Sequence, residues 1–540
     1  MRDELSPNGV EMGDWCGFLR KMRILFASAF FLSLVVSARL CKAQEAGFRP
    51  WVAPEPVEMG FVENANGNLH LEIPLGSYPQ RGTKNPVTYR YTYDSDIWLL
   101  NPIQNVWMIN PLFATLQGGW QIVSPSALNV YYSTDTSGSC TTYFDFLWLD
   151  ASGTQHAFPI TTDTCFPSDA NGDALSADSS GYHMYVTNYN NVKVYAPDGT
   201  LVCQSPAATD SKNHYIDAED ANGNYYTQTY GDELPPGFFD TTGRQAIQSY
   251  SSAPASFNSQ GQYSGYGVNV VSIPVKTAFG ESGVTEYSGS ITVIQSITLP
   301  TGGSYAFKYD CDSGTGNAAC GSPSGQAGYY GVLTSMTLPT GGTINYGYTT
   351  FSDSYGSRSR WLNSRTSTGG TWSYTPQVIS SCSYNQVGCQ EKVTVTKPSG
   401  ASTVYTFTLN NGAWPVEIQA SDSSGNVLST IKNTYDTSVA CPFNYSFSPC
   451  YGAGYVRLVT TQTSVPAPSG TITKQTSFSY DTPQQGNITA AKQWGYYPGS
   501  SPSFPSVPDK AVYTSYLSTG TNDINKPLTT TVCNNSVSDT

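Results

Sequence analysis

From about residue 60 onward, apolar and polar residues alternate with a period of two along much of the chain. In residues 87–94, VTYRYTYD, every second position from 89 on is aromatic, which places three side chains on one face of a strand: Tyr89, Tyr91 and Tyr93. Residues 144–158, FDFLWLDASGTQHAF, contain a strand, a Ser-Gly turn and a second strand, and residues 192–202, VKVYAPDGTLV, repeat this plan. The pattern predicts a succession of β-hairpins.

The second half of the chain repeats short sequences as well as the alternation. LPTGGSYAFKYD begins at residue 299 and LPTGGTINYGY at residue 338, while looser copies begin at residue 397 (KPSGASTVYTFTL) and residue 467 (APSGTITKQTSFSYD). A proline and a glycine turn precede an alternating strand in each copy. The residues that we assign to repeat turns are Pro300, Gly302, Gly303, Pro339, Gly341, Gly342 and Gly243.

The composition supports the same fold class. The chain has 540 residues, of which 39% are hydrophobic and 12% charged, so it can bury a core. Its 38 tyrosines suit pleated surfaces, and its 50 glycines and 34 prolines suit turns. We therefore predict an all-β fold in which repetitive antiparallel β-hairpins form an extended, curling sheet or a partial shell.

The N-terminus has the layout of an export signal. Residues 24–38, ILFASAFFLSLVVSA, follow a basic segment and precede small residues that end at Ala43. A run of about 15 apolar residues is shorter than the roughly 20 that a membrane-spanning helix needs. We predict a leader with a signal peptide in residues 1–43, with Met22 as the true start, no transmembrane segment after it, and a secreted or cell-surface location.

Charge and cysteine usage restrict the partners and the chemistry. The net charge of -13 disfavours binding to phosphate backbones, so we expect no nucleic acid partner. Three close cysteine pairs predict disulfides in an oxidising compartment: Cys311 with Cys320, Cys382 with Cys389, and Cys441 with Cys450. Zinc is the alternative, but no CxxC occurs and the four histidines are scattered. The sequence leaves open the pairing of Cys140, Cys165, Cys203 and Cys533.

Motifs for catalysis are absent from the sequence. GxSxG, HExxH, P-loop and GxGxxG patterns do not occur, and residues 299–303 have Gly302 where a cell-wall sorting signal needs threonine. We expect no enzyme and no cofactor, although a catalytic triad need not be local in sequence, and paired carboxylates for glycoside hydrolysis cannot be chosen from sequence.

Two acidic turns offer oxygen atoms at alternating positions, as calcium loops do. DANGD at residues 169–173 has Ala174 where an EF-hand requires glycine and Ser180 where it requires glutamate. In DAEDANGN at residues 217–224, turn formation by itself explains the Asp and Asn residues. We therefore assign no metal site.

Several segments resemble RHS or YD-repeat proteins: DANGNYYTQTYGDELPPGFFDTTGR at residues 220–244, SDSSGNVLSTIKNTYD at 421–436 and SYDTPQQGNIT at 479–489. GFVENANGNLHLEIPLGSYPQRG at residues 60–82 resembles the start of secreted bacterial members. The resemblance runs from about residue 60 to residue 540. It implies a bacterial protein whose repeats form a long spiralling sheet that closes into a hollow shell.

The resemblance also suggests the domain organisation and its limits. We expect a β-rich N-terminal region at residues 44–205 and an RHS/YD-like repeat region at residues 206–540, truncated at the C-terminus. The autoproteolytic core of the family, with its Arg-Tyr-Tyr-Asp-Pro type motif, has no counterpart before Thr540, and no toxin domain follows. No catalytic residue of the family is therefore carried over.

Three functions fit these observations. The first is a structural shell segment that encloses or presents a C-terminal effector. The second is an extracellular glycan-binding adhesin, in which exposed members of the 38 Tyr and 10 Trp residues stack on sugars instead of filling cross-strand pairs. The third is an extracellular hydrolase on a β scaffold. The expected partners are a downstream effector domain and surface glycans, and the cargo and oligomeric state stay open.

Overall fold

The computed structural model describes residues 54–78, 87–101, 104–110, 116–123, 129–150, 155–176, 180–197, 200–205, 208–209, 215–219, 223–228, 237–241, 245–248, 267–322, 327–383, 388–409, 413–436, 457–481, 487–516 and 527–534. The predicted signal peptide and Met22 lie outside these ranges. Among the described residues, no helix has the length and apolar character needed to cross a membrane.

The described chain is almost entirely β, which confirms the predicted all-β class. It contains five sheets and two short 3-10 turns, η2 (Pro167–Asp169) and η3 (Ser313–Thr315). Pairing between the named strands is antiparallel except for one short parallel contact, between β23 (Ser304–Asp312) and β24 (Cys320–Ser322). The predicted plan of consecutive hairpins therefore describes most of the molecule.

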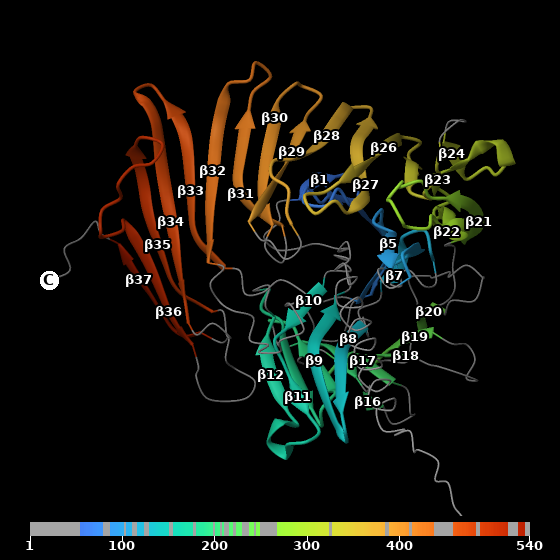
Figure 1. Cartoon of the computed structure of the whole chain (residues 1–540), viewed down its shortest axis with the longest axis horizontal. Helices are drawn as coiled ribbons and strands as arrows, with labels where there is room; N and C mark the ends of the chain where they lie inside the picture. Colours follow the sequence, from blue (N-terminus) through green and yellow to red (C-terminus); the bar gives the residue numbers. More distant parts are fainter. Residues whose placement is uncertain are drawn as a thin grey trace, which may run out of the picture.

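The largest sheet has 17 strands and curves as an open arch that does not close into a barrel (Figure 1). Its strands follow chain order, with an additional pairing between β23 and β25 across the short β24. Besides β23 and β24, its strands are β21 (Gly267–Lys276), β22 (Ser288–Thr298), β25 (Leu333–Thr337), β26 (Thr343–Ser352), β27 (Arg358–Ser367), β28 (Gly370–Val378), β29 (Cys389–Thr396), β30 (Ser402–Leu409), β31 (Ala413–Ser421), β32 (Val427–Asp436), β33 (Arg457–Ala467), β34 (Gly470–Tyr480), β35 (Ile488–Pro498), β36 (Lys510–Tyr516) and β37 (Pro527–Asn534).

Alternation along these strands determines which side chains enter the core. In β29 the buried positions alternate with half-buried ones, and Val393 and Val395 belong to the buried set. In β23 the pattern is the one that the sequence predicts: Tyr305, Phe307 and Tyr309 share one face and are buried. One face of the sheet is therefore apolar in this part of the arch, and it needs a covering layer.

That layer comes from the N-terminal part of the chain. A five-stranded sheet has the order β1-β2-β3-β4-β7, and a two-stranded sheet pairs β5 with β6. These strands are β1 (Glu55–Val57), β2 (Gly60–Val62), β3 (Leu69–Tyr78), β4 (Val87–Asp94), β5 (Trp98–Asn101), β6 (Val106–Ile109) and β7 (Trp120–Val123). Their buried apolar side chains form one continuous core with those of β21 to β30.

Aromatic side chains fasten the two layers to each other. The Trp120 indole Nε1 donates a hydrogen bond to the Tyr309 hydroxyl at 2.8 Å, and the Trp120 ring packs edge-on against Phe307. The Tyr93 hydroxyl accepts a hydrogen bond from the Leu333 backbone N–H at 2.7 Å. Because each of these polar groups is buried, the contacts fix the layers in one register as well as covering the apolar face.

A second core lies between two further sheets, which Figure 1 shows beneath the arch. Phe146, Trp148, Phe158, Met184 and Val194 are buried in it. The four-stranded sheet contains β8 (Asn129–Ser137), β9 (Cys140–Leu149), β10 (Gln155–Phe158) and β11 (Thr162–Asp163). The nine-stranded sheet contains β12 (Gly172–Leu175), β13 (His183–Thr187), β14 (Asn191–Tyr195), β15 (Leu201–Ser205), β16 (Ala208–Thr209), β17 (Tyr215–Glu219), β18 (Tyr225–Gln228), β19 (Gly237–Asp240) and β20 (Gln245–Gln248).

Two predicted hairpins belong to this sandwich. β9 pairs with β10, and β14 pairs with β15, both antiparallel. The domain boundary expected between residues 205 and 206 stays a prediction; in the structure, β15 on one side of it pairs with β17 on the other through Leu201 and Glu219.

Candidate functional site

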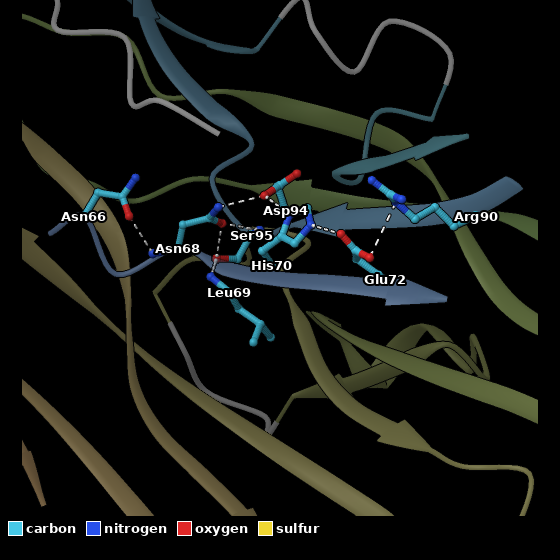
Figure 2. A network of polar contacts seen from close by, with 8 residues as sticks. All are labelled: Asn66, Asn68, Leu69, His70, Glu72, Arg90, Asp94 and Ser95. Atoms are coloured by element: carbon cyan, nitrogen blue, oxygen red, sulfur yellow. Dashed lines mark hydrogen bonds and ion pairs between the residues drawn. The ribbon is translucent and has the colours of Figure 1, made fainter. Parts of the chain in front are cut away.

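A network of polar side chains lies where β3 meets β4 in the N-terminal sheet (Figure 2). Asp94 is the acceptor at its centre: its Oδ1 atom receives a hydrogen bond from Asn68 Nδ2 at 2.7 Å and lies 2.9 Å from His70 Nδ1. All three side chains are buried. His70 and Asp94 face each other because they occupy directly opposed positions on the two strands.

The network continues from His70 toward the surface. His70 Nε2 lies 3.5 Å from Glu72 Oε1, and Glu72 Oε2 lies 3.5 Å from Arg90 Nε. The Glu72 side chain is 40% exposed, so the chain of charges runs from a fully buried imidazole to water. The ring of Phe61 stacks on His70 at a centroid distance of 4.7 Å, which shields the imidazole.

Burial and two carboxylates act on His70 in opposite directions. Burial lowers the pKa of His70, but the charge of Asp94 and the hydrogen bonds to Asp94 and Glu72 outweigh it and raise the pKa to about 9. The hydrogen bond from His70 in turn lowers the pKa of Glu72, against the effect of its partial burial. At neutral pH the site therefore holds an imidazolium between two carboxylates.

Ser95 closes the other side of the network. Its backbone N–H donates to Asn68 Oδ1 at 2.9 Å, and its hydroxyl accepts from the Leu69 N–H at 2.9 Å. Asn66 Oδ1 accepts from the Asn68 N–H at 3.0 Å, so the turn before β3 is fixed at several points. With its hydroxyl held at the Asn68–Leu69 turn, Ser95 is not placed as a nucleophile for His70.

Asp96 is the adjacent acidic residue, and its environment differs from that of Asp94. It is 3% exposed, and its Oδ2 atom has no hydrogen-bond partner in the structure. Burial, followed by the nearby charge of Asp94, raises the pKa of Asp96 well above its ordinary value. In this arrangement His70 stays protonated and Asp96 resists ionisation. Such electrostatics favour a structural role, in which polar contacts hold neighbouring strands together.

The two LPTGG turns share a single geometry. In LPTGG at 299–303, the Leu299 N–H donates to the Gly303 carbonyl at 2.7 Å and the Gly302 N–H to the Leu299 carbonyl at 2.9 Å. LPTGG at 338–342 has the same two bonds, from Leu338 to Gly342 at 2.7 Å and from Gly341 to Leu338 at 2.8 Å. Gly302 and Gly341 have φ of 88° and 87°, a conformation that favours glycine.

The other residues assigned to repeat turns do not all lie in described LPTGG turns. Pro300 and Pro339 lie within these same turns, and the Pro339 Cβ lies 3.0 Å from where a Cβ on Gly303 would stand. Gly243 lies outside the described residues. The looser copy at residue 467 forms a different turn, in which Ala467 pairs directly with Gly470.

Asp and Asn residues recur at these hairpin ends as partners. Asn487 Nδ2 donates to Asp481 Oδ2 at 2.7 Å, and Asn426 Nδ2 donates to Asp422 Oδ2 at 2.9 Å. With Asn68 and Asp94 this makes three such pairs. In the pairs Asp94–Asn68 and Asp481–Asn487, the aspartate follows a tyrosine in the sequence and the asparagine follows a glycine. Recurring Tyr-Asp and Gly-Asn dipeptides thus supply the two halves of one hydrogen-bonded clamp.

Six of the eight cysteines in the described part of the chain form disulfides. Cys311 is bonded to Cys320 and Cys382 to Cys389, as the sequence predicts. A third bond, which the sequence left open, joins Cys140 to Cys165. Cys441 and Cys450 lie outside the described residues. Cys203 is buried in the second core, and Cys533 is exposed on β37.

Carboxylates and thiols that could hold a metal ion come together once in the described ranges, at Cys140, Asp163 and Cys165. The two thiols are joined in a disulfide, so they do not offer thiolate ligands. In the acidic turn at 169–173, Asn171 Oδ1 accepts from the Asn188 N–H at 3.2 Å and Asp173 Oδ2 lies 3.4 Å from His183 Nε2. These oxygens are committed to protein contacts.

Many tyrosines and tryptophans with described side chains are buried, among them Trp120, Tyr309 and Tyr374. A few are exposed, among them Tyr131 and Tyr132 on β8 and Tyr496 on β35, with relative exposures of 47%, 39% and 48%. The His70 network was not anticipated by sequence reasoning. Its signal was present in the recurring Gly-Asn and Tyr-Asp dipeptides, whose side chains meet across 26 residues.

Comparisons with known proteins do not assign a family. No protein-family model matches the chain, and no curated protein matches it. Among solved structures, a chain in the crystal structure of TcdB2-TccC3-TEV matches 86% of this chain with 8% sequence identity and a TM-score of 0.19. The match spans 24% of that chain's length. A TM-score of 0.19 does not establish a shared fold.

Proposed function

We propose that this chain is a secreted bacterial structural protein whose arch is a segment of a shell that encloses or presents an effector segment. The observation that carries the proposal is the strand order of the large sheet, in which each strand pairs with the next along the chain. A sheet built this way grows by adding one hairpin at a time, and its curvature makes a wall (Figure 1).

The hairpin ends support a structural role. The turns at 299–303 and 338–342 share one hydrogen-bonding pattern, and Asp–Asn clamps hold the turns near Asp422 and Asp481. Disulfides close two of the loops between strands, at Cys311–Cys320 and at Cys382–Cys389. These devices stabilise an extended sheet, and none of them needs a ligand.

Protease protection tests the shell. The full gene product would be secreted and treated with proteinase K, and the fragments would be identified by mass spectrometry. A shell predicts that the segment following Thr540 is degraded at least about tenfold more slowly than the same segment expressed without residues 267–540. Equal degradation rates, or a stop codon directly after Thr540, would contradict the enclosing and presenting role.

Export is tested separately. Expression from Met22 in a bacterium should yield a protein outside the cytoplasm whose first residue is Gln44. A protein that keeps residues 22–43 and stays in the cytoplasm would refute the secreted form of the proposal, while leaving the fold unaffected.

A glycan-binding adhesin is the second candidate, and the exposed tyrosines favour it. Tyr132 projects from β8, packs edge-on against Tyr143, and its hydroxyl accepts a hydrogen bond from Asn190 Nδ2 at 3.3 Å. An aromatic ring beside an amide can stack on a sugar and hydrogen-bond its hydroxyls. On a glycan array, binding that Tyr132→Ala abolishes and Tyr496→Ala preserves would support this function; an array without any bound glycan would contradict it.

A further inference from the structure

A serine, a histidine and an aspartate meet in the second sandwich, and none of them belongs to the His70 network. His156 lies on β10 directly opposite Trp148 on β9. Ser180 Oγ lies 3.1 Å from His156 Nδ1, and Asp150 Oδ2 lies 3.5 Å from His156 Nε2. We propose that these three residues form a hydrolytic relay in which Ser180 is the nucleophile, His156 the general base and Asp150 the carboxylate that orients the imidazole.

The protein holds the imidazole firmly in this position. The His156 ring stacks on Trp148 with centroids 5.2 Å apart, and the tilted ring of Tyr182 lies 4.6 Å from it. The His156 side chain is 2% exposed, so the imidazole is buried except where it meets Ser180. Asp150 is 19% exposed and Ser180 is half-buried, so the nucleophile is partly accessible.

Ser176 lies close to both Ser180 and Tyr182. The Ser176 N–H donates to the Tyr182 carbonyl at 2.8 Å. The Ser176 hydroxyl lies 2.9 Å from the Ser180 hydroxyl. A run of hydroxyl, hydroxyl, imidazole and carboxylate therefore extends from Ser176 to Asp150, and Ser180 occupies the position next to the base.

The two ring nitrogens are used in the order opposite to that of serine proteases, where the base receives the proton on Nε2. Here Nδ1 faces the serine and Nε2 faces the aspartate. A carboxylate at Nε2 favours the tautomer that carries its proton there, and this tautomer leaves Nδ1 free of a proton to accept one from Ser180. In this orientation the nucleophile faces the nitrogen that accepts its proton, and the carboxylate faces the nitrogen that keeps one.

The reaction that fits is hydrolysis of an uncharged carboxylic ester. Ser180 Oγ attacks the ester carbonyl carbon while its proton passes to His156 Nδ1, and the tetrahedral intermediate releases the alcohol, which takes that proton. Water then attacks the acyl-serine by the reverse use of His156, giving the carboxylic acid and regenerating Ser180. The contacts around the relay are aromatic rings and hydroxyls, which suit an uncharged acyl group. An ester fits better than an amide because the alcohol of an ester is the better leaving group.

His183 provides a matched control within the same sandwich. Its Nδ1 lies 2.9 Å from the Tyr185 hydroxyl and its Nε2 lies 3.4 Å from Asp173 Oδ2, so the arrangement has the same parts with a phenol in place of the serine. Removing the Tyr185 hydroxyl thus removes a hydrogen-bond partner from a buried histidine without removing the proposed nucleophile.

The test uses the purified full chain with a fluorophosphonate probe and with p-nitrophenyl acetate. The probe should attach to Ser180, as peptide mass spectrometry would show. Ser180→Ala and His156→Gln should lower the rate of p-nitrophenol release by a factor of about 10²–10⁴. Asp150→Asn should lower it and move the acid limb of the pH profile, and Tyr185→Phe should leave it unchanged.

Three outcomes would overturn the relay: no labelled residue, a label on a residue other than Ser180, or equal rates for Ser180→Ala and the unmodified chain. Circular dichroism would verify that each variant folds. If Ser180→Ala does not fold, Ser180→Cys replaces it. A cysteine in the relay should react with iodoacetamide at least about tenfold faster than it does in the Ser180→Cys, His156→Gln double variant, and equal rates would refute the assignment of the base.

Discussion

His70 makes the stability of the N-terminal sheet depend on pH at the scale of a single residue. Its pKa is about 9 in the folded chain and near 6.5 when unfolded. A raised pKa means that its contribution is complete below about pH 6.5 and is lost as the pH rises through 9. In the unmodified chain, the free energy of unfolding should decrease by about 3 kcal/mol between pH 6 and pH 10 because of His70. We expect this decrease to be absent from His70→Gln when both chains are measured by urea denaturation.

His183→Gln is the matched control for that measurement. Burial lowers the pKa of His183 more than Asp173 raises it, so its contribution weakens on the acid side instead, as the pH falls through the unfolded value of about 6.5. This variant should keep the alkaline decrease of the unmodified chain. An alkaline decrease of equal size in His70→Gln would show that other groups cause it.

Asp96 should respond to pH in the same direction as His70, but over a lower pH range. Because burial raises its pKa, the folded state loses stability as the pH rises above the unfolded value of about 4. Asp96→Asn keeps the size of the side chain and removes the ionisation. We expect the variant to be more stable than the unmodified chain at pH 7 and to lose that advantage at pH 3, in urea denaturation at both values; a destabilised variant at pH 7 would contradict the assigned environment.

At the scale of the hairpin, the two glycines of LPTGG differ in what they require. Gly341 has φ of 87° and open space where an added Cβ would stand, so Gly341→Ala suffers from its backbone conformation alone. We expect a loss of about 1–2 kcal/mol in the free energy of unfolding. The measurement is chemical denaturation followed by the fluorescence of the core tryptophans.

Gly342→Ala is the control at the next position. An added Cβ there would meet Leu338 Cδ1 at 3.8 Å and Thr340 Oγ1 at 4.0 Å, which are ordinary contacts, and Gly342 is not in the left-handed region. Its stability should change by less than about 0.5 kcal/mol. Equal losses in both variants would mean that the turn does not depend on the positive φ of Gly341.

Turns and strands could be predicted from sequence because their causes are local. The alternation in residues 304–309 and the glycine at 302 act within a few positions, and the structure has β23 and the positive φ there. The His70 site could not be predicted in the same way, because Asn68 and Asp94 are 26 residues apart. The Ser180–His156 contact spans 24 residues and depends on how two sheets pack. Sequence patterns do not reveal such pairs, because only the fold brings the two residues together.

At the scale of the whole molecule, the two cores should unfold as separate units. Trp120 is 1% exposed in the core that joins the N-terminal sheet to the arch, and Phe146 is fully buried in the sandwich core. We expect Trp120→Ala and Phe146→Ala each to cost about 3–5 kcal/mol, but in different places. Hydrogen exchange followed by mass spectrometry of peptides locates the loss.

In Trp120→Ala, amide protection should fall in β3, β4, β23 and β25 together, because Trp120 packs against Phe307 and hydrogen-bonds Tyr309 across the two layers. Protection in β9 and β13 should stay unchanged. Phe146→Ala should give the reverse pattern. Loss of protection throughout the chain in both variants would show a single cooperative unit, and the N-terminal sheet would then owe its position to the sandwich as well as to the arch.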